Sequence, residues 1–474
     1  MRASIAAERA GFPTASIVLT GFLGMAEAIA TSEGMSNLAL AEYPGVILTD
    51  SDETVKNKVE KVLVDNIIKS LTLPPKEAAE TAEPAPLDIV FEGTLEEVTD
   101  YFEANLWTDG LPIVPPTRES VQRFLEFTDR RADEVLGVLP PEKREASVWS
   151  VAVNGVMAGC RPEYMPLLIA VVEAIAEPEF RLQDAGSTPG WEPLIIVNGS
   201  IVKQLGFNFE AGAMRVGRRA NTSLGRFLRL FMRNVAGFRI LPGQTDKGCL
   251  GFTFNVALAE NEDAVNEIGW EPFSVQRGFG RGENVVTVQS VVYISPPTYS
   301  GGDSAKDHLE TIAEVIGRKT AAYWTFNFVH WARSFPLIVM SPSVAKVLAR
   351  DGYSQDDVKR YLYENVKTPA GENEKFARQM GQTKFSFCEE VSIGNAPKEY
   401  WESNDPNRLV PVFIKPEWIG IIVSGDPDRN QSKGYINNHE QGAPVSKRIV
   451  LPKRWEQLLE KSMCRDGICK FVKA

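Results

Sequence analysis

A proline- and alanine-rich segment prevents this chain from folding around one continuous core. Residues 73–88 include four prolines and almost no side chains that a hydrophobic core would bury. A segment of this composition is typical of a semi-rigid linker between domains. We therefore predict a small domain over residues 1–72 and a large body after residue 88, with a first half at 89–300 and a second half at 301–474.

The overall composition excludes several classes of protein. The 474 residues include 51 Lys plus Arg against 62 Asp plus Glu, which gives a net charge of −11. This acidic balance argues against a nucleic-acid-binding or anionic-membrane surface, and no uncharged apolar run reaches the length of about 18 residues that spans a bilayer. Five scattered cysteines do not form a secreted disulfide framework, so we predict a soluble cytoplasmic protein.

The small domain alternates helices and strands in the order that is typical of a parallel α/β unit. Glu8 and Glu27 argue against the alternative that the opening is a secretory signal. Open parallel sheets usually begin with a strand, so we predict that this unit lacks its first strand. The predicted helices cover residues 3–9, 25–32 and 52–71, and the predicted strands lie at 15–20 and within 43–48.

The large body, which we predict to be α/β or α+β, contains a faint internal repeat. Residues 191–205 resemble residues 334–348, with a proline and a lysine at matching places, each separated by 143 residues. Each copy predicts a buried strand, a turn and a helix. An internal duplication would give two similar halves with a ligand cleft between them. The alternative is two generic strand–turn–helix units.

The sharpest candidate for chemistry is the segment 154–166, in which Cys160 follows a glycine and precedes a predicted helix start. Arg161 and the free N–H groups of that helix would stabilise a thiolate or a bound anion. Glu163 is a nearby acid–base candidate. The alternative is a buried structural cysteine in front of a helix, because Cys is among the most buried residue types.

A second candidate is an arginine-rich segment. Residues 215–226 contain four arginines in an acidic protein, and Arg219, Asn221 and Arg226 lie near the start of a predicted helix. Guanidinium groups beside a helix N-terminus suit a carboxylate or a phosphate, whereas the alternative is a solvated basic face. The glycine-rich residues 277–282 lack the spacing of a dinucleotide-binding loop, so no cofactor is predicted.

The histidines and the C-terminal cysteines give weaker signals. The three histidines are far apart, so no metal site is predicted, but His439 lies in a polar loop and is a candidate substrate-binding residue. Cys464 and Cys469 are spaced for neither thioredoxin chemistry nor a zinc knuckle. They would form a reversible disulfide or shuttle reducing equivalents, unless they are two unremarkable thiols of a flexible tail.

Several segments of the chain resemble one family. Residues 6–14, followed by a strand, are similar to the first helix–strand step of the UGSC-like (seleno)protein family and, more distantly, to the selenoprotein B component of glycine reductase. The resemblance implies a thiol- or selenol-based redox role with a thiol or selenol electron donor. Further similar pieces of the large body lie at residues 108–117, 157–164, 193–199, 219–226, 259–262 and 351–360.

The chain departs from this family at one point. The family's Sec/Cys-Gly-Ser-Cys loop would lie directly before the first predicted helix, and this chain begins at that helix. Three explanations are open: a selenocysteine codon read as a stop, a small partner subunit that supplies the loop, or a branch that uses Cys160 instead. The second explanation predicts a hetero-oligomer with an exposed sheet edge or helix face in residues 1–72.

Three hypotheses for function follow from these observations. The leading one is an oxidoreductase that acts on a small carboxylate or phosphate-bearing substrate with Cys160 as nucleophile. The second is a non-redox lyase or hydratase in which carboxylates transfer protons, which requires a pKa raised by burial. The third is a subunit of an enzyme whose Cys/Sec loop lies on a partner chain. The predicted catalytic residues are Cys160, Glu163, Asp109 and Glu260, and the predicted substrate-binding residues are Arg161, Arg219, Asn221, Arg226, Asn261 and His439.

Overall fold

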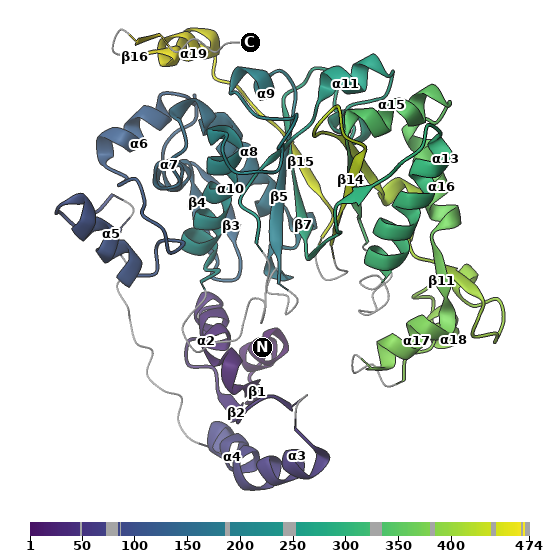
Figure 1. Ribbon diagram of the computed structural model, residues 1–474. Helices are drawn as coiled ribbons and strands as arrows, with labels where there is room; N and C mark the ends of the chain where they lie inside the picture. Colours follow the sequence, from purple (N-terminus) through teal and green to yellow (C-terminus); the bar gives the residue numbers. More distant parts are fainter. Residues whose placement is uncertain are drawn as a thin grey trace.

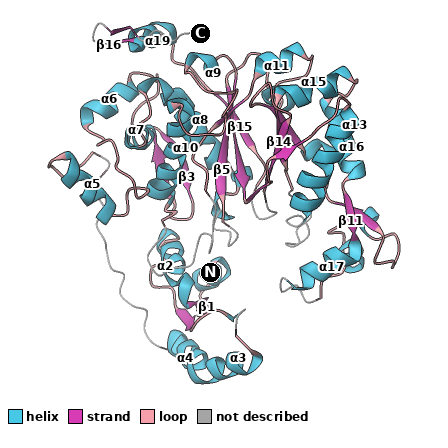
Figure 2. Cartoon of the chain, viewed as in Figure 1, coloured by secondary structure: helices cyan, strands magenta, loops and turns pink. Residues whose placement is uncertain are grey.

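Helices and strands alternate over both parts of the chain, so the predicted α/β class is confirmed (Figure 1, Figure 2). Within the described residues, no helix is both long and apolar enough to cross a membrane. The computed structural model describes residues 1–47, 50–72, 84–85, 87–184, 190–239, 253–322, 334–379, 384–437, 442–465 and 468–469.

The N-terminal unit is a two-stranded parallel sheet with helices around it. Ala41, Tyr43 and Leu63 belong to a small core of its own. The second strand ends at Tyr43 instead of continuing beyond it as predicted, because Pro44 has no N–H to donate. The elements are α1 (Arg2–Arg9), β1 (Ser16–Leu19), α2 (Leu23–Ser32), β2 (Leu40–Tyr43), α3 (Asp52–Lys58) and α4 (Val64–Thr72).

The large body contains two open sheets that each combine parallel and antiparallel strands. The first has the strand order β15–β7–β5–β6, and the second has the order β13–β10–β14–β8, with β9 also paired to β14. The bounds are β5 (Glu192–Asn198), β6 (Leu258–Ala259), β7 (Val285–Val291) and β15 (Val445–Arg448) in the first sheet, and β8 (Tyr293–Ile294), β9 (Thr298–Tyr299), β10 (Leu337–Met340), β13 (Gly420–Val423) and β14 (Gln431–Ile436) in the second.

Helices flank the pair of sheets on both sides (Figure 1). The α-helices that the structure describes in the large body are α5 (Leu95–Ala104), α6 (Arg118–Leu125), α7 (Val148–Met157), α8 (Met165–Ala176), α9 (Ile201–Gln204), α10 (Arg219–Phe231), α11 (Glu262–Glu267), α12 (Phe273–Gln276), α13 (Ala305–Ile312), α15 (Pro342–Arg350), α16 (Gln355–Asn365), α17 (Ala370–Gln379), α18 (Phe387–Ser392) and α19 (Trp455–Met463). Short two-stranded ribbons pair β3 (Val135–Leu139) with β4 (Arg144–Ser147), β11 (Lys367–Pro369) with β12 (Leu409–Pro411), and β16 (Cys464–Arg465) with β17 (Ile468–Cys469).

The two sheets pack against each other between the two layers of helices. Along β5, Leu194 and Ile196 belong to the core between the sheets, whereas Ile195 and Val197 belong to the core that includes α8 and α10. Alternate residues of β10 divide in the same way between the central core and the core that includes α13 and α16. Such continuous apolar runs are typical of strands that are buried on both faces. The body is therefore a four-layer arrangement of helices, sheet, sheet and helices.

The predicted repeat has a counterpart in the sheet topology. β5 pairs in parallel with β6 and antiparallel with β7, and β10 pairs in parallel with β13 and antiparallel with β14. Each central strand leads to a helix, α9 or α15. Strands from both sides of residue 300 share the sheets, because β15 pairs with β7 while β8 and β9 pair with β14. A duplication as the origin of this similarity stays a prediction.

Candidate functional site

The structure divides the predicted site residues into two groups. Six of them surround the starts of α8 and α10, and we call this group the Cys160 cluster: Cys160, Arg161, Glu163, Asp109, Arg219 and Arg226. Three others, Asn221, Glu260 and Asn261, bind backbone near the ends of β6 and β13. His439 lies outside the described residues. Among the described residues, no group of three or more His, Cys, Asp or Glu is arranged to hold a metal ion.

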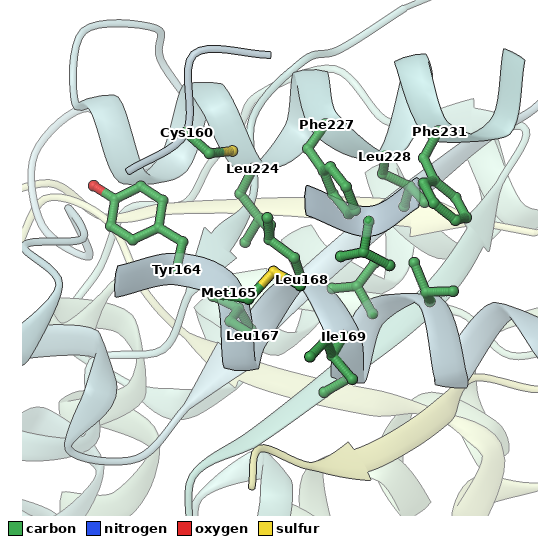
Figure 3. Packing of buried hydrophobic residues seen from close by; sticks show 14 of the residues in the cluster. Cys160, Tyr164, Met165, Leu167, Leu168, Ile169, Leu224, Phe227, Leu228 and Phe231 are labelled. Carbon is green, nitrogen blue, oxygen red and sulfur yellow. The ribbon is translucent and has the colours of Figure 1, made fainter. Parts of the chain in front are cut away.

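Cys160 is buried in the apolar core between α8 and α10. Its side chain lies beside Leu224 in the packed cluster of Figure 3, and its thiol donates to the carbonyl oxygen of Ser223 at 3.4 Å. Burial raises the pKa of Cys160 to about 12, although the Ser223 bond and the charges of Arg219 and Arg226 oppose that shift. At neutral pH the thiol therefore keeps its proton, and this environment does not favour the predicted nucleophile.

Arg226 and Asp109 form a bidentate ion pair in the Cys160 cluster. Arg226 Nε and Nη2 each lie 2.8 Å from an oxygen of Asp109, and Nη2 also donates to the carbonyl of Pro112 at 2.9 Å. Although burial opposes the change, the Arg226 guanidinium lowers the pKa of Asp109. Arg226 thus holds the loop that carries Asp109 against α10, and its charge is already balanced within the protein.

The remaining charges of the Cys160 cluster are held more loosely. Arg219 is exposed, and its Nε donates to the carbonyl of Gly159 at 2.8 Å. Arg161 Nη1 lies 3.9 Å from Oε1 of the buried Glu163. The buried Nε of Arg161 has no hydrogen-bond partner among the described residues. The Arg219 bond therefore holds the residue before Cys160 against α10.

Asn221 is a fully buried residue whose side chain bonds to backbone, rather than an exposed binding group. Its Oδ1 accepts from the N–H of Asn208 at 2.8 Å, and its Nδ2 donates to the carbonyls of Asn208 and Ala257 at 3.0 and 2.9 Å. The side-chain amide thereby supplies hydrogen-bond partners to backbone groups of the two segments that contain Asn208 and Ala257. Its predicted role in substrate binding has no support in this geometry.

Glu260 lies where the carboxyl ends of the two parallel strand pairs meet, and we call its surroundings the Glu260 junction. Its Oε2 accepts from Asn198 Nδ2 and from the N–H of Phe273, both at 2.6 Å, and its Oε1 accepts from the N–H of Val423 at 3.4 Å. Next to it, the N–H of Asn261 donates to the carbonyl of Val423 at 2.8 Å. One carboxyl group therefore ties the first sheet to the second.

The charge state of Glu260 follows from this burial. Burial raises its pKa to about 8, against the hydrogen bonds from Phe273, Asn198 and Val423, and the nearby carboxylate of Glu262 adds to the rise. Asn198 Nδ2 also donates to Glu262 Oε1 at 3.0 Å, so one amide bridges the two carboxyl groups. Glu260 is thus a carboxyl group that holds its proton at neutral pH. Asn261, whose side chain accepts from the N–H of Ala264, caps α11.

A cavity of about 960 Å³ lies apart from both groups, between the segment 84–118 and α7, and we call it the α5–α7 cavity. Its volume is at the upper end of the range of about 300–1,000 Å³ that ligand pockets occupy. Its apolar and aromatic wall includes Phe91, Phe102, Trp107, Trp149 and Met157, and its polar lining includes Asp88, Glu92, Asn105, Thr117, Arg118, Arg144, Asn154, Asn234 and Arg239.

The wall of the α5–α7 cavity is held in place by specific contacts. The Phe91 and Tyr101 rings stack at 4.6 Å between centroids, and Phe102 meets Trp107 edge-on at 5.4 Å. Asn234 Nδ2 donates to the Trp107 carbonyl at 3.2 Å. Arrangements of this kind add to the stability that burial of the rings gives. The wall residues of the cavity are therefore held by contacts within the protein.

The sequence prediction missed this cavity because it assigned residues 73–88 to a linker and looked for charged motifs. A usable signal was present, since Leu87, Ile89 and Phe91 alternate directly after the last proline and aromatic residues follow at Tyr101 and further on. Alternation of this kind indicates that the stretch packs apolar side chains against the rest of the protein, here at the α5–α7 cavity, and is not a plain linker.

Residues 1–73 match the family model described as the UGSC family. No curated protein and no solved structure shows a significant match to the chain. The similarity to glycine reductase and the motifs quoted for the large body stay predictions, because the match covers the first part of the chain. The N-terminal unit of this chain is UGSC-like, as its opening residues predict.

Proposed function

We propose that this chain is the substrate-binding subunit of an enzyme that acts on a small organic anion, and that the α5–α7 cavity holds the apolar body of that anion. The observation that carries the proposal is the cavity itself, which combines a large volume, an aromatic wall and an excess of arginine over carboxylate.

The aromatic wall favours an apolar substrate body. Burial of apolar surface contributes roughly 25 cal/mol per Å², and Trp149 and Phe91 are only partly buried by the protein. A planar or branched hydrocarbon group that covers these rings would gain both this burial and ring contacts. A cavity of about 960 Å³ admits a molecule considerably larger than a two-carbon acid.

The charges of the lining favour an anionic head group. Three arginines, Arg118, Arg144 and Arg239, line the cavity together with the carboxylates of Asp88 and Glu92 in a chain whose net charge is −11. Arg144 also pairs with Glu142, with Nε 2.6 Å from Oε2. Arginine presents a planar set of donors that matches carboxylate and phosphate groups. These arginines support the anionic substrate that the sequence predicts. They are not the arginines that the sequence proposed for binding it, which were Arg161, Arg219 and Arg226.

The reactive group is best supplied by a partner chain. The thiol of Cys160 is buried and protonated, and Asp109 is held by Arg226. Neither Cys160, Asp109, Glu163 nor Glu260 is among the described residues that line the cavity. The UGSC match of residues 1–73 supports a thiol or selenol on a partner, because that chemistry is what the resemblance implies. The lyase hypothesis receives less support than the partner-chain hypothesis, because its proton-transferring carboxylates, Asp109, Glu163 and Glu260, are not among the described residues that line the cavity.

Two fluorescent probes test the proposed cavity in the full-length chain. Anilinonaphthalene sulfonate and N-phenylnaphthylamine share an aromatic body, and only the first carries an anionic group. We expect saturable binding of the sulfonate at one site, tighter than that of the neutral probe. Trp149→Ala removes part of the wall, so we expect it to weaken binding of both probes by about tenfold, which corresponds to roughly 1.4 kcal/mol.

Trp401→Ala is the matched control, because Trp401 is a partly exposed tryptophan outside the cavity lining. It should leave the affinity of both probes unchanged. Equal affinities of the wild type and Trp149→Ala, or a loss of binding in Trp401→Ala, would place the probe elsewhere and contradict the proposal.

A further inference from the structure

The C-terminal ribbon places two cysteines directly opposite each other. β16 and β17 run antiparallel, with Cys464 opposite Cys469 and Arg465 opposite Ile468. Directly opposed residues of antiparallel strands have Cα atoms about 4.5 or 5.5 Å apart, depending on the hydrogen-bond pattern. Both values fall within the range of about 4.4–6.8 Å that a disulfide requires. The backbone register therefore satisfies the main geometric condition for a cross-strand bond.

The sequence between the two strands agrees with this register. The two joining residues, Asp466 and Gly467, lie outside the described residues. Asp-Gly is one of the residue pairs that two-residue β-hairpin turns prefer. A spacing of four residues between the cysteines then brings them to the same rung of the ribbon.

The ribbon also begins on a firmly docked helix. Trp455 of α19 is buried, donates from Nε1 to Gln204 Oε1 at 3.2 Å and meets the ring of Phe127 edge-on. Leu459 and Ser462 are buried as well, and Cys464 follows the last residue of α19. The first cysteine thus continues directly from an anchored helix, which argues against the flexible-tail alternative.

We infer that Cys464 and Cys469 form a reversible disulfide across this ribbon, a redox site independent of the α5–α7 cavity. The oxidant is a low-molecular-weight disulfide such as oxidised glutathione. One cysteine thiolate attacks it and releases one glutathione thiol, and the second thiolate then attacks the mixed disulfide and releases the other. Two protein thiols are oxidised, one glutathione disulfide is reduced, and the two protons pass to the released thiols.

Tryptic mapping of the full-length protein tests this inference, because Arg465 lies between the two cysteines. The reduced protein is equilibrated with mixtures of reduced and oxidised glutathione, alkylated and digested. In the oxidised form we expect the peptides 462–465 and 466–470 to stay joined by a disulfide. In the reduced form the joined species falls roughly tenfold or more, and each peptide carries one alkyl group.

Cys388→Ser is the matched control and should leave the joined species unchanged, since Cys388 lies on α18. Cys464→Ser should abolish it and leave Cys469 alkylated or bound to glutathione. The inference is overturned if the wild type gives only separate glutathione adducts on the two peptides, or if either cysteine is joined to a cysteine elsewhere in the chain.

Discussion

The Cys160 cluster and the α5–α7 cavity share one loop but differ in how their polar groups are used. Residues 107–117 supply Asp109 to the ion pair with Arg226, and the same segment supplies Trp107 and Thr117 to the cavity wall. In the cluster, the thiol of Cys160 and the Arg226–Asp109 pair are bound to protein atoms. In the cavity, aromatic rings and three arginines line the volume, and of these arginines Arg118 also donates to the carbonyl of Leu87 and Arg144 also pairs with Glu142. A dense motif is therefore a weaker sign of a ligand site than groups that surround an open cavity.

The largest expected effect tests whether the Cys160 cluster is structural. Arg226→Ala leaves Asp109 and the carbonyl of Pro112 without their partner, so we expect the free energy of unfolding to fall by about 3 kcal/mol. The two side chains are 16% and 17% exposed, which places the loss at the low end for a broken buried pair. Urea unfolding measures it. The exposed Arg215→Ala serves as control, with an expected change below about 0.5 kcal/mol.

The Glu260 junction is tested by the pH dependence of stability. Burial raises the pKa of Glu260 to about 8 from a model-peptide value near 4.5. The folded state then binds this proton more tightly than the unfolded state, so stability is fully present below the unfolded pKa and is lost as pH rises through the folded pKa. The loss is about 1.4 kcal/mol per pH unit inside that window.

Glu260→Gln imitates the protonated carboxyl and does not titrate. The stability of the wild type relative to this variant should therefore fall by about 2 kcal/mol between pH 5.5 and pH 7, as followed by unfolding at each pH. A constant difference across that range would show that Glu260 is ionised in the folded protein.

The charge of the cavity is tested by Arg118→Gln. The glutamine retains an N–H donor in place of the one that Arg118 gives to the carbonyl of Leu87, but it removes the positive charge. We expect the affinity for anilinonaphthalene sulfonate to fall about fivefold, or roughly 1 kcal/mol, while the neutral N-phenylnaphthylamine binds as before. Equal losses for both probes would mean that Arg118 acts through packing rather than charge.

The smallest effect on probe binding belongs to Cys160. Cys160→Ala removes one buried sulfur, so we expect a stability loss of about 1 kcal/mol and no change in the binding of either probe. In the native wild type, a thiol reagent should modify Cys388 before Cys160, because Cys388 is partly exposed and Cys160 is buried. Rapid modification of Cys160 without denaturant would restore the nucleophile hypothesis.

The sequence predicted the fold more fully than the site. The order of α1, β1, α2 and the long α3–α4 region follows from local periodicity, and so does the burial of β5 and β10 on both faces. Their pairing into two packed sheets depends on β6, β13 and β15, of which β6 has only two residues. A strand of two residues shows no alternation of apolar and polar side chains, so the pairing of β6 could not be predicted from the sequence.

The predicted site residues show the same limit. The sequence placed Cys160 before a helix and beside arginines, and both a reactive and a buried cysteine agreed with that pattern. The depth of its burial is set by α10, which lies about sixty residues further along the chain. Likewise, Asp109 and Arg226 are both charged residues in the sequence, and only their contact shows that each balances the other.

The sequence by itself determined the α/β class and the UGSC-like character of residues 1–73, because these depend on local periodicity and a contiguous motif. The tertiary structure alone decided which polar groups are bound to one another and which surround open space. Hydrogen bonds, burial and pKa depend on neighbours that are distant in the chain. The α5–α7 cavity exists only because segment 84–118 packs against α7, and the local sequence pattern of neither segment predicts that contact.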